Sequence, residues 1–394
     1  MANYRPQNIA GISGCDTLNV LMISKALVAG AYQKKLEEIA THDDVNLSVV
    51  VPPAWGAQRL ERVHTDGYRL IVSDIRFNGN FHFHFYPKLK HIMAETAPDV
   101  VHIDEEPYNF ATFHALKLAQ KFGAKTVVFS WQNINRRYPP PFRQMEQYVL
   151  AHTNGLIVGN AEAQSVWREK GYRGDMWQIP QFGVDPAIFY RRERVLRASK
   201  PSVVLQRSAR RPSQPALVIG YVGRLVEEKG VELLMKAVAG LNGPWEMKVL
   251  GSGPDRLRFE RMAQVLGIEA RVTFDRQLPS THMPNYLSGL DVLVLPSLSR
   301  PNWKEQFGRV LIEAMACEVV AVGARSGAIP EVMGDAGLLF DEGDEAGLRS
   351  QLQRLLDDVS LRTQLRERGK TRVLQNYTHA AIAAHTVEVY RRLR

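Results

Sequence analysis

Two series of short apolar runs, each alternating with helical patterns, constrain the fold of this chain more than any other feature. Such runs are typical of strands buried on both faces of a parallel sheet. The first series occupies residues 18–24, 47–51, 100–103, 126–130 and 155–158. The second occupies residues 217–222, 247–250, 272–274, 292–295 and 319–322. The alternation predicts an α/β protein with two Rossmann-like halves.

Size and composition agree with two soluble domains. The chain has 394 residues, of which 45% are hydrophobic, enough for two packed cores. Its two cysteines, Cys15 and Cys317, cannot form a disulfide framework, and no Cys/His cluster has the spacing of metal ligands. No apolar run reaches the roughly 18 to 20 residues that span a bilayer, and the N-terminus lacks the apolar core of a signal peptide. We expect a cytoplasmic protein, with peripheral contact at the inner face of a membrane still open.

Two glutamates eight residues apart frame the segment E-Q-F-G-R-V-L-I-E, which follows the expected strand end at 295–297. Gly308 can open a helix whose free N–H groups attract phosphate. Glu305 would then lie in the loop over the pocket, and Glu313 about one and a half turns into the helix. Because carboxylates accept hydrogen bonds from vicinal hydroxyls, the pattern favours a nucleotide-sugar. Taken alone, the spacing is also that of a surface helix with two solvated glutamates.

A second phosphate-binding element is expected at G-Y-V-G-R-L-V-E-E-K-G, where an apolar strand ends in glycine. Arg224 and Lys229 lie five residues apart in the turn that follows. The guanidinium offers a planar fork and the ammonium a compact charge, so both can converge on one pyrophosphate. Ligands of open α/β sheets lie at such strand ends. The alternative for an isolated Arg and Lys is a solvated surface.

The run 291–340 carries a resemblance to a known family. It contains D-V-L-V-L-P-S, E-Q-F-G-R-V-L-I-E-A-M-A-C, S-G-A-I-P-E-V and G-L-L-F in order. This run resembles the donor-binding core of the retaining glycosyltransferases of family four, the glycosyl transferases group 1, which have the GT-B fold. The resemblance implies two Rossmann-like domains whose parallel sheets face a central cleft, with a C-terminal helix crossing back to the N-terminal domain. The expected parts are 1–183 (acceptor side), 184–215 (basic linker), 216–375 (nucleotide-sugar side) and 376–394 (closing helix).

The same resemblance implies roles for donor-side residues. Glu305 would hold the donor sugar, Glu313 the ribose, and the amides of Phe307 and Gly308 the sugar or phosphate. Arg224 and Lys229 would hold the diphosphate and stabilise its charge as it departs, so they and Glu305 are the expected catalytic residues. Further donor-side residues are Gly223, Gly251, Gly253, Arg276 and Arg309. The Gly251 to Pro254 segment resembles the family's G-x-G-P turn, for which a plain tight turn is the alternative. The identity of the base does not follow.

The N-terminal half departs from the family where the acceptor is expected. Relatives usually carry a Gly-Gly loop after the first strand, whereas Gly30 is the one glycine in 24–31. Gly30 is either a site residue or a helix start, and Lys25 is expected to be exposed. Glu105 lies in a segment that resembles the family's V-H-x-H-x-x-P, with Asp104 where a second His is common. These acids either hold acceptor hydroxyls or are solvated charges in a loop.

Three further acceptor-side or sugar-side residues are Gln132, Asn133 and Arg136. Gln132 occupies the place where many relatives carry a His, and an amide cannot serve as a general base. In the family the departing phosphate is thought to take the acceptor proton, so Gln132 need only bond a sugar hydroxyl. Arg136 belongs to N-R-R-Y-P-P-P-F, whose aromatics and cations suit a sugar or an acceptor phosphate. A loop made rigid by prolines is the alternative.

Two donor-half segments also depart from the family pattern. Cys317-Glu318-Val319-Val320 stands in place of C-G-x-P, and Ser326-Gly327-Ala328 in place of a Gly-Gly pair. Neither change removes a charged ligand. A glutamate at position 318 indicates a turn that does not demand positive φ.

The formal net charge of +9 is concentrated in residues 191–211, which hold eight basic residues and one acid, Glu193. A solvated linker is one interpretation; attraction to anionic lipid or to a phosphorylated acceptor is the other. Nucleic acid is not an expected partner, because no nucleic-acid-binding motif accompanies the charge.

The sequence as a whole predicts a retaining, metal-independent glycosyltransferase without a cofactor. It would move a sugar from a nucleotide-diphosphate sugar to a hydroxyl acceptor, a saccharide, a lipid-linked saccharide or a small molecule, in polysaccharide or glycoconjugate biosynthesis. Two alternatives stay open: a catalytically silent sugar-nucleotide-binding protein, and a glycogen- or sucrose-type synthase of the same fold.

Overall fold

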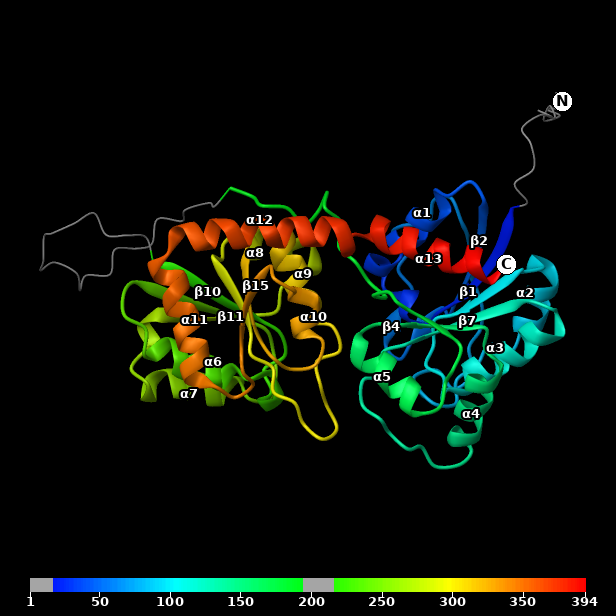
Figure 1. The fold of residues 1–394 in the computed structure, drawn as a ribbon, viewed down its shortest axis with the longest axis horizontal. Coiled ribbons are helices and arrows are strands. Elements are labelled where there is room, and N and C mark those ends of the chain that lie inside the picture. The colour runs from blue at the N-terminus through cyan, green and yellow to red at the C-terminus, as the bar shows by residue number, and fades with distance from the viewer. Residues whose placement is uncertain (1–16, 194–215) are drawn as a thin grey trace, which may run out of the picture.

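Two parallel sheets, one in each half of the chain, form the centres of two lobes in the computed structural model (Figure 1). The structure describes residues 17–193 and 216–394. Cys15 and most of the basic segment, residues 194–211, lie outside the described residues. Among the described helices, none has the length and apolarity needed to cross a membrane.

The sheet of the N-terminal lobe has seven strands in the order β5-β2-β1-β6-β7-β8-β9, and each pairs in parallel with its neighbour. The central strands are buried along nearly their whole length, which is why they stand out as continuous apolar runs. Their bounds are β1 Leu18–Ile23, β2 Val45–Val51, β5 Arg69–Val72, β6 Val100–Ile103, β7 Lys125–Ser130, β8 Gly155–Val158 and β9 Asp175–Gln178.

Five helices of the first half pack around this sheet, and a short antiparallel hairpin lies outside it. Asn160 begins α5 as its N-cap, because its side chain accepts a hydrogen bond from the Ala163 N–H at 2.8 Å. The bounds are α1 Lys34–Ala40, α2 Leu89–Thr96, α3 Phe110–Lys121, α4 Phe142–His152 and α5 Ala161–Glu169, with β3 Ala54–Trp55 and β4 Gln58–Arg59 forming the hairpin.

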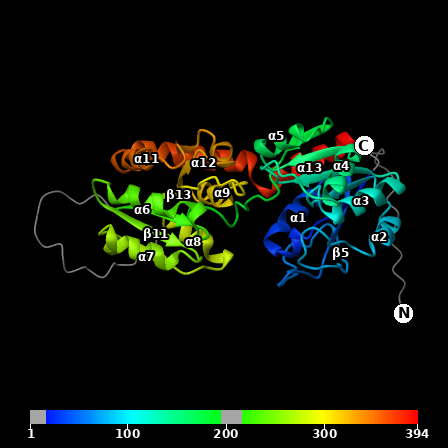
Figure 2. The same ribbon diagram turned by 90° about the horizontal axis from the view of Figure 1, so that it is seen from below.

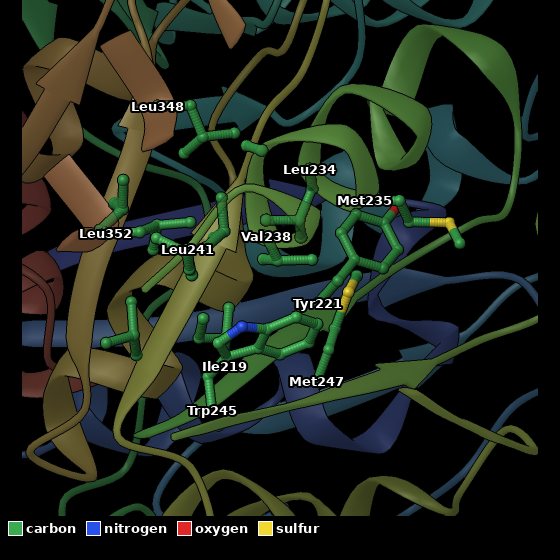
Figure 3. Packing of buried hydrophobic residues seen from close by; sticks show 14 of the residues in the cluster. Ile219, Tyr221, Leu234, Met235, Val238, Leu241, Trp245, Met247, Leu348 and Leu352 are labelled. Carbon is green, nitrogen blue, oxygen red and sulfur yellow. The ribbon is translucent and has the colours of Figure 1, made fainter. Parts of the chain in front are cut away.

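The sheet of the C-terminal lobe has six parallel strands in the order β12-β11-β10-β13-β14-β15. Its core is packed by side chains from β10, β11 and the helices on one face, with Trp245, Tyr221 and Met247 close together in Figure 3. The strands are β10 Leu217–Val222, β11 Trp245–Leu250, β12 Val272–Asp275, β13 Val292–Leu295, β14 Val320–Ala324 and β15 Gly337–Phe340. The helices are α6 Val231–Ala239, α7 Arg256–Val265, α8 Met283–Ser288, α9 Arg309–Ala316, α10 Ile329–Met333 and α11 Glu345–Asp357.

The last two helices join the lobes. Helix α12 (Val359–Asn376) runs along the C-terminal lobe, and α13 (His379–Leu393) continues onto the N-terminal lobe (Figures 1 and 2). Thr378 caps α13 by accepting the Ala381 N–H, and the buried face of α13 joins the core around β1 and β2. Burying a side chain such as Val387 stabilises the fold by about 1.5–3 kcal/mol relative to leaving it exposed, so this helix holds the lobes together. The predicted fold class, with its returning C-terminal helix, is confirmed.

The turn after α9 corrects one prediction. Glu318 has a φ of 57°, so this turn does adopt positive φ although it carries no glycine. The Val319 N–H bonds the Ala314 carbonyl at 2.9 Å and the Glu318 N–H bonds the Met315 carbonyl at 3.0 Å. This pairing is a Schellman motif, whose first residue past the cap is left-handed. These two hydrogen bonds offset the unfavourable backbone conformation. The Lys370 ammonium also forms an ion pair with the Glu318 carboxylate at 2.8 Å.

Each sheet has one topological switch point, where strand order reverses. In the N-terminal sheet it lies between β1 and β6, and in the C-terminal sheet between β10 and β13. Open α/β sheets bind ligands outside the carboxyl ends of the strands at such points. The segments that follow these four strands therefore define where a site is expected.

Candidate active site

The loop between β13 and α9 carries the first glutamate of the predicted pair. The Glu305 carboxylate accepts hydrogen bonds from the Lys229 ammonium at 2.6 Å and from the Ser297 hydroxyl at 3.1 Å. Lys229 follows β10, so the ion pair spans the switch point of the C-terminal sheet. The Lys229 ammonium also lies 4.7 Å from the centre of the Trp303 ring. Lys229 and Glu305 are thus brought together, each largely shielded from solvent.

Gly308 makes the start of α9 possible, as expected. Its φ is 73°, and a Cβ there would lie 2.9 Å from a methyl carbon of Leu295 at the end of β13. Only glycine meets both demands without strain. The preceding Phe307 is buried and packs against Trp131 of the N-terminal lobe, with ring centres 5.5 Å apart. The start of α9 is thereby held against the N-terminal lobe.

The second glutamate lies inside the helix. Glu313 is 6% exposed, and its carboxylate accepts a hydrogen bond from the Arg309 guanidinium at 2.6 Å. Burial raises the pKa of Glu313, and Arg309 opposes that rise. The same guanidinium lies 5.3 Å from the ring centre of Tyr32, so Arg309 connects α9 to the N-terminal lobe. Glu305 and Glu313 therefore have separate cationic partners.

Glycines shape a pocket at the ends of β10 and β11. A Cβ on Gly251 would lie 1.9 Å from the Gly223 carbonyl oxygen, so the two loops approach more closely than any side chain allows. Likewise, a Cβ on Gly253 would lie 2.2 Å from the carbonyl oxygen of Leu225. The pocket has a volume of about 330 Å³ and is lined by Val222, Gly223, Arg224, Leu250, Gly251, Ser252, Gln277, Leu278 and Met283.

The two predicted phosphate-binding cations differ in their surroundings. The Arg224 side chain is 70% exposed at this pocket, and its nearest carboxylate belongs to Glu228 at 3.9 Å. The Lys229 side chain is only 17% exposed and is paired with Glu305. Arg276 is exposed in the segment next to Gln277, which lines the pocket. Arg224 is therefore accessible to a ligand, whereas Lys229 must exchange partners to reach one.

The acceptor-side residues fall into two groups. Asn133 and Arg136 reach the other lobe: the Asn133 amide donates to the Glu305 carbonyl at 3.3 Å, and the Arg136 guanidinium donates to the Asn302 carbonyl. Gly30 starts a 3₁₀ turn, and its N–H is occupied by the Glu61 carboxylate at 2.8 Å. The structure thus brings Asn133 and Arg136 to the Glu305 loop, but not Gly30.

Gln132 has an unusual hydrogen-bonding state. Its side-chain NH₂ donates to the Ile134 carbonyl at 3.1 Å, while its side-chain oxygen is buried and accepts no hydrogen bond. Buried polar atoms are rarely left unpaired. The free oxygen is suited to accept a hydrogen bond from a hydroxyl, as predicted for this position, but not to take a proton.

One expectation about the first lobe is wrong, and one of two alternatives is excluded. Lys25 is 9% exposed rather than solvent-accessible, and it forms an ion pair with Glu105, which is 2% exposed. The acids after β6 are likewise no solvated loop charges. Asp104 accepts hydrogen bonds from the Ser24 hydroxyl at 2.7 Å and the Gln181 amide at 2.8 Å. The long-range pairing of β1 with β6 buries these charges, and neither segment alone signals it.

The next acid, Glu106, supports the loop after β7. Its carboxylate accepts hydrogen bonds from the Ser130 hydroxyl at 2.6 Å and the Trp131 N–H at 2.8 Å. Burial raises the pKa of Glu106 to about 7 against these hydrogen bonds. Burial also lowers the pKa of Lys25 to about 8, although Asp104 and Glu106 act to raise it. Sequence reasoning singled out neither Glu106 nor a buried Lys25.

Hydrogen bonds between the lobes near Glu305 and α10 were not predicted. The Asn160 amide donates to the Gln306 carbonyl at 2.7 Å, and the Gln306 amide donates to the Trp131 carbonyl at 3.1 Å. The Glu331 carboxylate accepts the N–H of Ala161 at 2.8 Å, at the start of α5. The two Gln306 bonds hold the Glu305 loop against the first lobe, and the Glu331 bond holds α10 against α5. In the part of the chain that the structure describes, no group of three His, Cys, Asp or Glu side chains is arranged to hold a metal ion.

The chain is similar in sequence to known glycosyltransferases. Residues 206–372 match the family model described as "Glycosyl transferases group 1". The lipopolysaccharide core biosynthesis glycosyltransferase LpsE of Rhizobium meliloti is 34% identical over 169 residues, covering 42% of this chain and 47% of that protein. A D-inositol 3-phosphate glycosyltransferase of Corynebacterium urealyticum is 30% identical over 274 residues, covering 66% and 61%. The chain spans about half the length of LpsE and of two further curated relatives.

Solved structures share the whole architecture. HepE of Anabaena, in complex with UDP, matches with a TM-score of 0.68 at 18% identity over 95% of this chain and 100% of that chain. Sucrose-phosphate synthase of Thermosynechococcus elongatus matches with a TM-score of 0.67 at 19% identity over 95% and 99%. At such identities the likeness shows the fold, which is GT-B.

Proposed function

We propose, from the premise that this chain belongs to the glycosyl transferases group 1 family, that it transfers a sugar from a nucleotide-diphosphate sugar to a hydroxyl acceptor. One observation carries the proposal: Lys229 and Glu305 meet at the switch point of the C-terminal sheet, beside a glycine-lined pocket with Arg224 at its edge. A cation, a carboxylate and open backbone at one strand edge match a ligand that has both phosphate and sugar hydroxyls.

Donor binding would exchange the partners of the Lys229–Glu305 ion pair. Without ligand, each shielded charge compensates the other. A diphosphate would take the Lys229 ammonium together with the exposed Arg224, and sugar hydroxyls would take the Glu305 carboxylate. The amides of Phe307 and Gly308 lie at the same helix start, where anions are stabilised. Glu313 would hold the ribose, at a site where the Arg309 guanidinium donates a hydrogen bond to its carboxylate.

The proposed reaction is a retaining displacement without a metal. The bond from the anomeric carbon to the diphosphate oxygen breaks, and a bond to the acceptor oxygen forms on the same face. The acceptor proton passes to the departing diphosphate, so no protein base is required. Gln132 fits this scheme because its free oxygen can bind a hydroxyl but cannot hold a proton. Arg224 and Lys229 would stabilise the charge that accumulates on the leaving group.

The acceptor and the cellular setting extend this proposal. The names of three relatives refer to lipopolysaccharide core biosynthesis, to D-inositol 3-phosphate and to L-malate, so we infer a role in glycoconjugate or polysaccharide biosynthesis. A cytoplasmic location stays a prediction. So does contact with an anionic membrane, which rests on a basic segment largely outside the described residues.

A catalytically silent sugar-nucleotide-binding protein is the second candidate. Gln132 and the occupied N–H of Gly30, where relatives have a Gly-Gly loop, favour it. A synthase acting in the manner of the sucrose-phosphate enzyme is supported by fold alone.

Two measurements test the proposal. A thermal-shift screen of UDP, GDP, ADP and their sugars identifies the donor, since a ligand at 100 times its Kd stabilises by about 2.7 kcal/mol. Release of nucleoside diphosphate with a panel of acceptors then measures turnover, and the anomeric coupling in the product NMR spectrum gives the stereochemistry. Binding without turnover would favour the silent protein, and an inverted product would refute retention.

A further inference from the structure

A tight hairpin in the loop between β13 and α9 places an aromatic ring beside Lys229. The Arg300 N–H donates to the Trp303 carbonyl at 2.7 Å, and the Trp303 N–H donates to the Arg300 carbonyl at 3.1 Å. Pro301 and Asn302 form the exposed tip between them. A proline fixes φ near about −65°, which suits the first central position of the common β-turns. The hairpin therefore gives Trp303 a defined position after the end of β13.

Contacts with both lobes hold this hairpin. The Leu298 N–H donates to the Glu228 carbonyl at 2.8 Å, so the base of the hairpin is bonded to the residue before Lys229. From the other lobe, the Glu162 carboxylate accepts a hydrogen bond from the Lys304 ammonium at 2.9 Å. The hairpin is thus tied both to the turn that carries the lysine and to the facing lobe.

The Lys229 ammonium contacts two groups of different chemistry. It lies 4.7 Å from the centre of the Trp303 ring and 2.6 Å from an oxygen of the Glu305 carboxylate. The carboxylate takes one of the three N–H donors of the ammonium and compensates its charge. The ring attracts the cation through its negative face but carries no charge of its own. Two groups therefore restrain Lys229, and only one of them neutralises it.

These two restraints respond differently to a donor. In the proposed function, sugar hydroxyls take the Glu305 carboxylate and the diphosphate takes the Lys229 ammonium. The carboxylate then no longer holds the lysine, whereas the ring still does and leaves the N–H groups to the phosphate oxygens. A lysine has a flexible four-carbon stem, and fixing such a side chain on a ligand costs conformational entropy. A ring that keeps the ammonium in place reduces this cost.

We propose that Trp303 is a positioning residue, whose ring holds the Lys229 ammonium where the donor diphosphate binds. This inference rests on the proposed function, because it presupposes that Lys229 holds the diphosphate. It assigns to Trp303 an effect on diphosphate affinity that acts through Lys229 and needs no contact between the ring and the ligand. A ring that stacked directly on the donor would act without the lysine.

A double-mutant cycle on the full chain tests this role. The probe is whichever of UDP, GDP and ADP binds most tightly, and calorimetry measures its Kd. Trp303→Leu should weaken binding by about threefold to tenfold through loss of the cation–π contact. Trp303→Phe keeps an aromatic face and should retain most of the affinity. In the Lys229→Ala background, Trp303→Leu should have no further effect, because the cation that the ring holds is gone.

Matched variants separate a positioning role from general damage. Arg224→Ala removes the other proposed diphosphate cation, whose side chain is 70% exposed, and in that background Trp303→Leu should still weaken binding. Phe122→Leu removes an exposed ring of the N-terminal lobe and should leave the affinity unchanged. Melting curves of all variants identify any that fail to fold.

The outcomes keep this inference apart from the proposed function. Unchanged affinity in Trp303→Leu, or Trp303→Phe as weak as Trp303→Leu, would refute the positioning role and leave the proposed function standing. An equal loss with and without Lys229 would also refute it, since the ring would then contact the ligand directly or support the fold. If none of the nucleotides binds the wild-type chain, the proposed function itself fails, and the positioning role fails with it.

Discussion

The two lobes place a lysine–glutamate pair at the same topological position but enclose it differently. In the C-terminal lobe the side chains of Lys229 and Glu305 are 17% and 12% exposed, next to a pocket lined by glycines. In the N-terminal lobe those of Lys25 and Glu105 are 11% and 0% exposed, beneath two aromatic rings. The comparison indicates that strand order fixes where the ion pair lies, whereas the surrounding side chains fix how far it is enclosed.

The pocket of the C-terminal lobe is open because side chains are missing from its walls. Gly251 approaches the Gly223 carbonyl so closely that no Cβ fits, and this leaves backbone rather than side chains around the pocket. Backbone N–H groups suit phosphate, which is common to every nucleotide-sugar. At the corresponding place the N-terminal lobe has buried charged side chains instead, and a buried polar group left unpaired there would be costly.

The largest effect is expected from the cation of the donor pair. Lys229→Ala should lower turnover by about tenfold to a hundredfold, since a charge-assisted contact is worth roughly 1.5 to 3 kcal/mol. Arg224→Ala should cost at least about tenfold for the same reason. Initial rates with the identified donor measure both.

The two variants should differ in stability. Lys229→Ala leaves the shielded Glu305 without its cation and should lower the melting temperature, whereas Arg224 is exposed and its removal should not. Lys236→Ala, which alters an exposed lysine of α6, is the control and should change neither rate nor melting. Full activity in Lys229→Ala or Arg224→Ala would remove that residue from the mechanism.

A smaller and more selective effect is expected from the two glutamates. Glu313→Gln should weaken binding of the free nucleoside diphosphate, because its proposed partner is the ribose. Glu305→Gln should leave that affinity nearly intact and lower transfer, because its proposed partner is present only in the intact donor and matters most in the transition state. Calorimetry with nucleoside diphosphate, beside initial rates, distinguishes the two.

Equal loss of nucleotide affinity in both variants would show that the roles are wrongly assigned. Glu313→Gln also changes a buried ion pair with Arg309, so Arg309→Lys is a useful companion. It keeps the charge but loses the planar fork. If the ribose contact is real, Arg309→Lys should affect nucleotide affinity less than Glu313→Gln does.

What the sequence reveals depends on the position of a strand in its sheet and not on the lobe. Central strands such as β6 and β13 are buried on both faces and were predicted to the residue, because their apolar runs are continuous. The strands β5 and β9 were missed because both lie at sheet edges, where exposed residues interrupt the pattern. β15, also at an edge, was predicted only as part of the family resemblance.

The candidate site also has features that the sequence reveals, which are local, and features that it does not, which depend on long-range contacts. Gly308 and the G-x-G turn are local features, and their conformations agree with the local sequence. The Lys25–Glu105 pair joins residues 80 positions apart, and nothing near either residue signals the burial. The prediction for the turn at Glu318 was wrong for another reason. The hydrogen bonds that cap the helix impose a positive φ on a residue that does not favour it. Long-range burial and capping are therefore what sequence patterns miss.

A modest effect of pH is expected from Glu106 on the acceptor side. Its raised pKa means that the folded protein binds this proton more tightly than the unfolded chain does. Between pH 4.5 and about 7 the free energy of unfolding should therefore fall as the pH rises, and the effect of Glu106 should level off above that range. Each pKa unit corresponds to about 1.4 kcal/mol, so the contribution is measurable by denaturant titration.

The difference between wild type and Glu106→Gln isolates this contribution from other carboxylates. That difference should decrease with pH across the window. Glu95→Gln removes a carboxylate whose pKa is lowered by Arg69, so its difference curve should run the other way at acid pH. A flat curve for Glu106→Gln would mean that the carboxylate is not shielded as the structure indicates.

The smallest expected effect, no change at all, concerns divalent metal. In the proposed mechanism Arg224, Lys229 and the start of α9 supply the positive charge that other transferases obtain from a metal ion on the diphosphate. Turnover should therefore survive EDTA. Assays before and after chelation, with the nucleotide-sugar identified by thermal shift, measure this directly. Loss of activity on chelation, with recovery on adding magnesium or manganese, would contradict this expectation. It would show that Arg224, Lys229 and the start of α9 do not supply enough positive charge for the leaving diphosphate.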